Sequence, residues 1–374
     1  MKVVLAPDSF KESMSAAQAA AAMARGVRAV VPDAACIEVP MADGGEGTTD
    51  ALVAALGGEW RGLASQDALG RPIEARYGAT ADGLAIVEVA AAVGIGLIAR
   101  ADRDPMASTS LGVADLVTDA LDAGATRIIV GLGGTVTTDG GAGLLAGLGA
   151  LWLDAEGREL APTPGALAQL DRVDLAGLDP RLREVSVELA CDVTNPLLGP
   201  SGSAAVFGPQ KGATPEQVPV LDAVLARIAD ALVAAGLPDV RQRPGAGAAG
   251  GLGAAFLALG AGMRRGVDVV ADAAGLAGAV EGADLVLTGE GSIDSQTLSG
   301  KTPAGVADVA ARFGVPVIAF AGRLGEGVDQ LIDNGFAAVV SIVTEPCDLA
   351  TALRDGPANL ERAVATAIRL YQLG

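Results

Sequence analysis

Both ends of the chain alternate between short apolar runs and segments with helical periodicity, and this alternation is the strongest constraint on the fold. Strands are predicted at residues 3–6, 37–39, 285–287, 315–320 and 338–341. Helices are predicted at residues 16–31, 47–56, 302–313, 325–334 and 357–373. Strands that alternate with helices are typical of a parallel sheet with helices packed on its faces.

The first predicted helix has clear signals at both of its ends. Ser15 and Gln18 form a capping box, in which two side chains accept hydrogen bonds from backbone N–H groups at the helix start. Its apolar stripe consists of Ala16, Ala20, Met23, Val27 and Val30. Pro32 ends the helix because proline has no N–H group to donate. We therefore expect one face of this helix to pack on the sheet.

The middle of the chain has a different pattern. Three strand-like runs, at residues 59–64, 72–80 and 84–89, are joined by short turn sequences, and strands joined in this way are antiparallel. The elements predicted after them are a helix at 108–123, strands at 127–130 and 185–190, and a helix at 215–235. We therefore predict an α/β protein of two domains. Residues 1–58 and 280–374 would form a discontinuous, doubly wound parallel-sheet domain (flavodoxin/Rossmann-like), and residues 59–279 an inserted α/β domain.

The residue types that are missing exclude several kinds of chemistry. The chain has 374 residues and no histidine, which excludes Ser-His-Asp hydrolysis and zinc sites built on imidazole. Its three cysteines are far apart and form no CxxC pair, so neither a structural zinc site nor a disulfide framework is expected. Acid–base chemistry must therefore use Asp, Glu, Lys or Arg, together with a hard metal ion if carboxylates hold one.

Net charge, aromatic content and targeting signals limit the classes of partner and the location that we expect for this protein. A net charge of −19 and an aromatic content of 3% argue against nucleic acid and against an anionic membrane. The apolar run at the start is too short for a signal peptide, so we expect a soluble, cytoplasmic protein. The sequence is compatible with a homo-oligomer but does not determine one.

Six polar loops follow strand-like segments, and all but the first, at residues 7–13, combine glycines with Asp, Thr, Ser or Lys. Two of them, residues 131–143 and 245–253, run into helices rich in Ala and Leu. Glycine N–H groups at a helix start can hold a phosphate. The candidate nucleotide or phosphate ligands there are Gly133, Gly134, Thr135, Gly247, Gly250 and Gly251. The alternative is that these glycines only allow a helix to pack closely on a strand.

Lysine is rare, since only four of the 26 basic residues are lysines. Lys11 and Lys301 are predicted to be catalytic cations, and Lys211 to bind phosphate; the alternative is that all three are surface lysines. Lys301 lies in the sequence Gly300-Lys301-Thr302, which resembles part of a P-loop, but Ser295 replaces the first glycine of that motif. A standard P-loop is therefore rejected. A dinucleotide-binding fingerprint is also missing after the first strand.

Carboxylates in these loops can bind a metal ion or accept a proton. Asp43, Glu290 and Asp294 lie in Gly-rich loops and are predicted to hold Mg²⁺. Asp192 directly follows a predicted strand and is the candidate general base. The alternative is that such residues cap turns. Several Gly, Asp and Lys loops in one chain without histidine favour phosphoryl transfer.

At this point a family resemblance becomes specific. The opening Ala6-Pro7-Asp8-Ser9-Phe10-Lys11-Glu12-Ser13 resembles the start of the type I glycerate kinases. Further segments similar to that family, in the same order, are residues 42–48, 191–197, 207–212 and 288–291. The resemblance implies ATP-dependent phosphorylation of D-glycerate at the 2-hydroxyl, giving 2-phospho-D-glycerate and ADP. It also implies two α/β domains with the active site in the cleft between them.

The resemblance leaves several points open. It does not say which loop holds ATP and which holds glycerate; we assign Ser9, Asn195 and Arg323 to substrate binding. Family members usually carry Arg after Gly291, whereas this chain has Ser292, so affinity or substrate choice could differ. The alternatives are a glycerate 3-kinase or a kinase of a related small hydroxy acid, a dinucleotide-dependent oxidoreductase, and a non-catalytic small-molecule binding protein.

Overall fold

Two units, each built around its own sheet, make up the computed structural model, which describes residues 1–295, 297 and 301–373. Unit 1 consists of Met1–Gly58 and Arg265–Gly374, and unit 2 of Glu59–Arg264. The second boundary therefore lies at 264/265 and not at the predicted 279/280. The difference arises because two short helices, α10 (Gly266–Ala273) and α11 (Leu276–Val280), pack with unit 1.

Unit 1 contains a five-stranded sheet in which every pair is parallel, in the order β13-β12-β11-β1-β2. Its strands are β1 (Lys2–Leu5), β2 (Ala35–Glu38), β11 (Leu285–Ile293), β12 (Val317–Leu324) and β13 (Phe336–Ser341). Its other helices are α1 (Ala16–Arg28), α2 (Thr48–Leu56), α12 (Thr302–Ala311), α13 (Gln330–Asp333), α14 (Leu349–Arg354) and α15 (Gly356–Tyr371). The sheet runs from β1 outward to β2 on one side and from β11 outward to β13 on the other, so the strand order reverses between β1 and β11.

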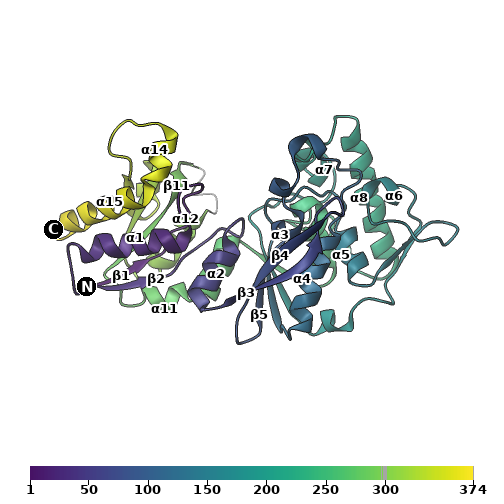
Figure 1. The fold of residues 1–374 in the computed structure, drawn as a ribbon, viewed down its shortest axis with the longest axis horizontal. Helices are drawn as coiled ribbons and strands as arrows, with labels where there is room; N and C mark the ends of the chain where they lie inside the picture. Colours follow the sequence, from purple (N-terminus) through teal and green to yellow (C-terminus); the bar gives the residue numbers. More distant parts are fainter. Residues whose placement is uncertain (296, 298–300, 374) are drawn as a thin grey trace. The chain divides into compact units, whose positions relative to one another are not determined.

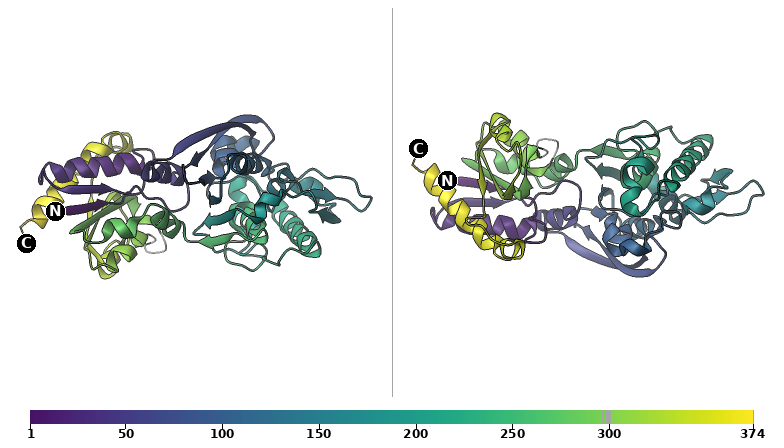
Figure 2. Two further views of the ribbon diagram at one scale, coloured as in Figure 1. Left: turned by 90° about the horizontal axis from the view of Figure 1, so that it is seen from below. Right: turned by 90° about the horizontal axis from the view of Figure 1, so that it is seen from above.

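Helices cover both faces of this sheet (Figures 1 and 2). On one face, α1 and α15 pack against each other and, through residues such as Met23, Val27 and Val364, form one core with β1, β11 and β12. The capping box of Ser15 and Gln18 is present as predicted. On the other face, α10, α11 and α12 pack together, and α2 contacts α10. A doubly wound parallel sheet is therefore confirmed for this unit.

Unit 2 contains a six-stranded mixed sheet in the order β10-β9-β6-β5-β4-β3. Its strands are β3 (Glu59–Gln66), β4 (Pro72–Ala79), β5 (Leu84–Glu88), β6 (Arg127–Gly131), β9 (Ser186–Ala190) and β10 (Gly262–Arg264), with a separate hairpin of β7 (Leu151–Leu153) and β8 (Arg172–Asp174). Strands β3, β4 and β5 pair antiparallel, as predicted from their short turns. The remaining pairs of the large sheet are parallel.

The helices of unit 2 enclose the largest core of the chain. They are α3 (Ala90–Val93), α4 (Leu111–Asp122), α5 (Ala142–Gly147), α6 (Pro164–Leu167), α7 (Ser203–Phe207), α8 (Gln217–Ala234) and α9 (Leu252–Ala258). Trp152 is 1% exposed within this core, and its indole N–H donates to the carbonyl oxygen of Ala142. In the part of the chain that the structure describes, no helix is both long and apolar enough to cross a membrane.

Two predicted elements of unit 1 differ in the structure. The strand predicted at 285–287 continues to Ile293, because β11 pairs with β12 up to Ile293 and Leu324. Glu290 and Ser292 are therefore strand residues, and the prediction that Glu290 lies in a loop is wrong. The helix predicted at 325–334 is reduced to Gln330–Asp333, because Gly327 has a positive φ of 74°, which no helix residue adopts.

Candidate functional site

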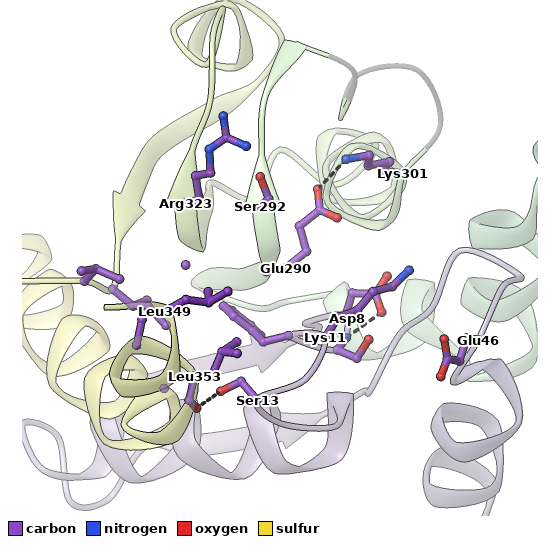
Figure 3. Close-up of a pocket in the computed structure, with 18 of the residues that line it drawn as sticks. Asp8, Lys11, Ser13, Glu46, Glu290, Ser292, Lys301, Arg323, Leu349 and Leu353 are labelled. Carbon is purple, nitrogen blue, oxygen red and sulfur yellow. Dashed lines mark hydrogen bonds and ion pairs between the residues drawn. The ribbon is translucent and has the colours of Figure 1, made fainter. Parts of the chain in front are cut away.

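A cavity of about 390 Å³ lies within unit 1, at the carboxyl ends of its strands. All five strands contribute to its lining or lead into it: Asp8 follows β1, Asp43 follows β2, Glu290 lies in β11, Arg323 in β12, and Ile342 follows β13. Ligands of open α/β sheets bind at this edge, next to the point where the strand order reverses. Figure 3 shows this cavity with most of the residues that line it.

Asp8 lies at the reversal point between β1 and β11. Its backbone N–H donates to the carbonyl oxygen of Gly289 at 2.8 Å, which ties the chain after β1 to β11. Its carboxylate accepts hydrogen bonds from the Thr302 hydroxyl at 2.5 Å and from the Ser9 N–H at 2.6 Å. Burial and the negative charge of Asp43 raise the pKa of Asp8 to about 7, against the effect of these two hydrogen bonds. A carboxyl group with such a pKa can exchange a proton near neutral pH.

Glu290 carries the second carboxylate at the reversal point. Its Oε1 lies 3.7 Å from the Lys301 Nζ and accepts a hydrogen bond of 3.0 Å from the Thr297 hydroxyl. Burial raises the pKa of Glu290, while Lys301 and Thr297 oppose the shift. Asp294 does not line the cavity, but its backbone N–H donates to the same Thr297 hydroxyl at 3.2 Å. Thr297, in the chain after β11, therefore helps to fix the position of the Glu290 carboxylate that pairs with Lys301.

The cavity also contains positively charged groups. Lys11 and Arg323 line it, and neither forms an ion pair with another residue that the structure describes, whereas Lys301 is paired with Glu290. Arg323 lies directly opposite Ser292 in the register of β12 and β11, and both residues line the cavity. Family members usually have an arginine at the position of Ser292 in β11. In this chain the guanidinium of Arg323 reaches the cavity from the neighbouring strand, β12. Cations without a carboxylate partner suit an anionic ligand.

The carboxylates fit a divalent cation bound together with a ligand. Asp43 lies close enough to Asp8 for its negative charge to raise the pKa of Asp8, a repulsion that a bound cation would relieve. Within the described ranges, no group of three or more Cys, Asp or Glu side chains forms a ready-made metal site. Mg²⁺ commonly takes only one or two carboxylates and completes its shell with water and phosphate oxygens. The donor set therefore suits a metal–phosphate complex.

Lys211 lies in unit 2 and is almost completely buried, at 2% exposed. Its Nζ donates to the Thr137 carbonyl oxygen at 2.6 Å and to the Thr135 hydroxyl at 3.2 Å. Burial lowers the pKa of Lys211 to about 7, although the charge of Asp139 opposes this. The alternative of a surface lysine is therefore wrong for Lys211, which ties the loop after β6 to the turn at 209–211.

The glycines of the 245–253 loop are crowded by backbone. A Cβ on Gly247 would overlap the carbonyl oxygen of Pro196, and a Cβ on Gly250 that of Thr137. A Cβ on Gly251 would lie 2.7 Å from the Cα of Gly140. These contacts favour the close-packing interpretation of this loop. Gly134 differs, because it is exposed and has only the Ala90 methyl group near its Cβ position.

The two remaining candidates, Asp192 and Asn195, also lie in unit 2. Asp192 follows β9 and is exposed. Asn195 uses its side-chain N–H to bond the carbonyl oxygen of Ser201 at 2.7 Å. Asp139 is fully buried and accepts hydrogen bonds from the Ser110 hydroxyl and from backbone N–H groups at the start of α5. Its geometry is that of a capping residue.

Comparison with known proteins assigns the chain to a family. The sequence model of the Glycerate kinase family matches residues 3–372. A "Glycerate kinase" from Bacillus subtilis (strain 168) is 46% identical over 375 residues, which cover 99% of this chain and 98% of the relative. A "Glycerate 2-kinase" from Escherichia coli (strain K12) is 45% identical, with 97% and 96% covered. A crystal structure from Salmonella typhimurium LT2, provisionally named glycerate kinase 2, has a TM-score of 0.92 at 45% identity, with 100% of this chain and 99% of that chain covered. The chain belongs to the glycerate kinase family.

The structure brings six of the predicted site residues to the lining of the same cavity in unit 1, the one of about 390 Å³. They are Ser9, Lys11, Asp43, Glu290, Lys301 and Arg323. Asp8 has no predicted role, although its place shortly after β1 is the same signal that selects Asp192 after β9. The apolar side of the cavity is also not predicted, because most of its residues come from the turn after β13 and from α14, which contain no glycine-rich motif. Gly300, quoted for the rejected P-loop, lies outside the described residues.

Proposed function

We propose that the chain catalyses the ATP-dependent phosphorylation of D-glycerate at its 2-hydroxyl group, giving 2-phospho-D-glycerate and ADP. Family membership supports a kinase that acts on an alcohol group. The observation that carries the proposal is the cavity of unit 1, where the buried Asp8 and the partly buried Asp43 and Glu290 meet Lys11, Lys301 and Arg323 at the reversal point of a parallel sheet. Phosphoryl transfer depends mainly on positioning and on charge, so a site without histidine is sufficient for it.

The cavity's carboxylates would hold Mg²⁺ on the phosphate side of the site. Asp43 and Glu290 are the proposed ligands inside the cavity, with Asp294 behind Glu290. When bound, Mg²⁺ neutralises charge on the phosphates. The Asp43 carboxylate already accepts a hydrogen bond of 3.0 Å from the Gly45 N–H, which fixes its orientation in the loop.

The cations of the cavity would contact phosphate oxygens or the carboxylate of glycerate. Lys301, at the N-terminus of α12, is held in position by its ion pair with Glu290, and Lys11 lies in the loop after β1. Arg323 would supply the positive charge that family members usually place at position 292, because Ser292 and Arg323 are register partners. Ser9 would bind substrate through its hydroxyl group. In unit 2, Lys211 would keep the loop with Thr135 in shape, and Gly133 and Gly134 would offer backbone N–H groups.

A carboxylate would accept the proton of the attacking hydroxyl group. Asp192 is the proposed acceptor, since it is exposed at the end of the rigid strand β9, with Asn195 nearby in sequence. Asp8 is a second candidate, because its pKa of about 7 suits proton transfer near neutral pH. The two lie in different units, so variants can separate them.

One reaction tests the proposal. The purified protein is incubated with ATP, Mg²⁺ and D-glycerate, and the product is identified by phosphorus NMR. We expect 2-phosphoglycerate, and no product when EDTA is in excess over Mg²⁺. Formation of 3-phosphoglycerate would instead make the enzyme a 3-kinase. Absence of any phosphoglycerate, or undiminished turnover in EDTA, would contradict the proposal.

A further inference from the structure

The cavity of unit 1 has an apolar side that phosphoryl transfer to a three-carbon acid does not require. Phe10, Ile342, Val343, Leu349 and Leu353 line it, and we call these residues the apolar wall. Phe10 and Ile342 are each 2% exposed, so the base of the wall is part of the protein core. Leu349, by contrast, is 71% exposed although it faces the cavity. A leucine exposed at the mouth of a cavity leaves apolar surface for a ligand to cover.

Side-chain chemistry changes along the cavity in a definite order (Figure 3). Leu349 and Leu353 lie at one end, and Arg323 and Ser292 lie above them. Glu290, paired with Lys301, comes next, and Asp8, Lys11 and Glu46 occupy the opposite end. The cavity therefore has an apolar surface at one end, with Arg323 beside it, and a mixed group of carboxylates and lysines at the other end. A nucleotide bound to a divalent cation has the same polarity, with an apolar ring system at one end and the charged phosphates and metal at the other.

The apolar wall is fixed in position, as a binding surface must be. The Ser13 hydroxyl donates to the Leu353 carbonyl oxygen at 2.6 Å, which ties α14 to the loop after β1. Asp348 caps the start of α14 by accepting a hydrogen bond of 2.7 Å from the Thr351 N–H. Gly356, at the start of α15, allows the close approach of Ser13, because a Cβ there would overlap the Ser13 hydroxyl.

We propose that the apolar wall binds the nucleobase of the phosphoryl donor, with Leu349 covering one face of the base at the cavity mouth. This inference rests on the proposed function in that it takes the donor to be a nucleoside triphosphate. D-Glycerate is a poor candidate for the wall, because it is small and every carbon carries oxygen. A cavity of about 390 Å³ is within the range of pockets that enclose larger ligands. The glycine loops of unit 2 are then not needed for recognition of the base.

The test compares a ligand that has a base with one that has none. Leu349→Ser removes apolar contact without adding charge, and Leu349→Met restores it. Leu370→Ser is the matched control, because Leu370 is 65% exposed on α15 and does not line the cavity. The dissociation constants of ADP and of inorganic tripolyphosphate are measured by calorimetry with Mg²⁺ present, together with KM for ATP and for D-glycerate.

We expect Leu349→Ser to raise the Kd of ADP about tenfold, as loss of a buried apolar contact does, while the Kd of tripolyphosphate stays unchanged. KM for ATP should rise in parallel, KM for D-glycerate should not, and Leu349→Met and Leu370→Ser should behave like the parent protein. An unchanged Kd for ADP, or an equal rise for ADP and tripolyphosphate, would overturn the proposal. A rise in KM for D-glycerate alone would assign the wall to the acceptor and also overturn it. Because ADP binding needs no turnover, a protein that binds ADP through Leu349 but does not phosphorylate glycerate would contradict only the proposed function.

Discussion

The two units use similar Gly-rich loops in different ways. In unit 1, the loop that carries Asp43 has Gly47 with a φ of 93° and no atom within 4 Å of its Cβ position, so this glycine makes a turn in open space. In unit 2, the loop that carries Gly250 is filled by the backbone of a neighbouring loop. The first arrangement leaves charged side chains facing a cavity, and the second buries Lys211 and Asp139.

This difference shows that glycine in a loop can have two structural roles. Glycine permits a positive φ, and it also permits another backbone to approach closely. Both roles lead to the same Gly-rich sequence, so the sequence alone cannot tell which of the loops binds a phosphate. In the structure, six of the residues predicted to bind or react line one cavity of unit 1, and five of these six are charged.

The largest predicted effect tests whether the proton acceptor belongs to unit 2 or to unit 1. Asp192→Asn keeps the size of the side chain and removes the base, so kcat should fall about 10²–10⁴-fold while ATP affinity stays near normal. Steady-state kinetics of Asp192→Asn and Asp8→Asn are compared. Turnover of Asp192→Asn within about threefold of the parent protein, with a large loss in Asp8→Asn, would move the acceptor to unit 1.

A smaller effect is predicted for the two cavity lysines. Lys11→Ala or Lys301→Ala should lower kcat/KM by about 10²-fold or more, because each removes a charge from the cavity in which phosphate is transferred. Lys2→Ala is the control, since Lys2 lies outside the cavity and donates to the carbonyl oxygen of Glu281. Wild-type kinetics in both cavity variants would make these residues ordinary surface lysines.

The crowding of glycine in unit 2 predicts a loss of stability. Gly250→Ala should lower the free energy of unfolding by more than about 3 kcal/mol, since the new methyl group would overlap the Thr137 carbonyl oxygen. Gly236→Ala is the matched control in the same unit, with a φ of 95° and open space around its Cβ position, and should cost only about 1–2 kcal/mol. Urea unfolding followed by tryptophan fluorescence measures both, because Trp60 and Trp152 lie in unit 2. Equal losses in the two variants would contradict the packing interpretation.

The smallest predicted effect is a pH dependence of stability that comes from Lys211. In the folded protein this group loses its proton near pH 7, whereas in the unfolded chain it keeps the proton to about pH 10. Between these values the unfolded chain binds more protons, so the free energy of unfolding should rise with pH from 7 to 10. Lys211→Met should lack this part of the rise. Parallel stability curves for the two proteins between pH 7 and pH 9.5 would contradict the lowered pKa.

Much of the fold was predictable because its signals are local. The capping box of Ser15 and Gln18 marks the start of α1, and the short turns between β3, β4 and β5 require antiparallel pairing. The errors involve residues whose structure depends on distant partners. β11 extends to Ile293 only because β12 pairs with it there, and α10 belongs to unit 1 only because it packs on α2 and α12.

The candidate site shows the same division between local and distant information. Lys11 and Lys301 could be selected because lysine is rare in the chain, and Asp43 because it lies in a Gly-rich loop. That they share a cavity depends on the strand order β12-β11-β1-β2, which no short segment of the sequence specifies. The apolar wall was not predicted for the same reason. Leu349 and Leu353 lie in a segment without a distinctive motif, and they line the cavity only because α14 packs beside the loop after β1. Whether the active site lies between the two domains stays a prediction.

Photolabelling with 8-azido-ATP tests most directly the claim that the nucleotide binds in unit 1. The protein is irradiated with the probe and Mg²⁺, digested, and the labelled peptides are identified by mass spectrometry, with excess ATP as the competitor. We predict that label displaced by ATP is found in residues 341–356, which contain Leu349 and Leu353 of the apolar wall. Label found instead in residues 131–141 or 245–253 of unit 2, and displaced by ATP, would contradict the account.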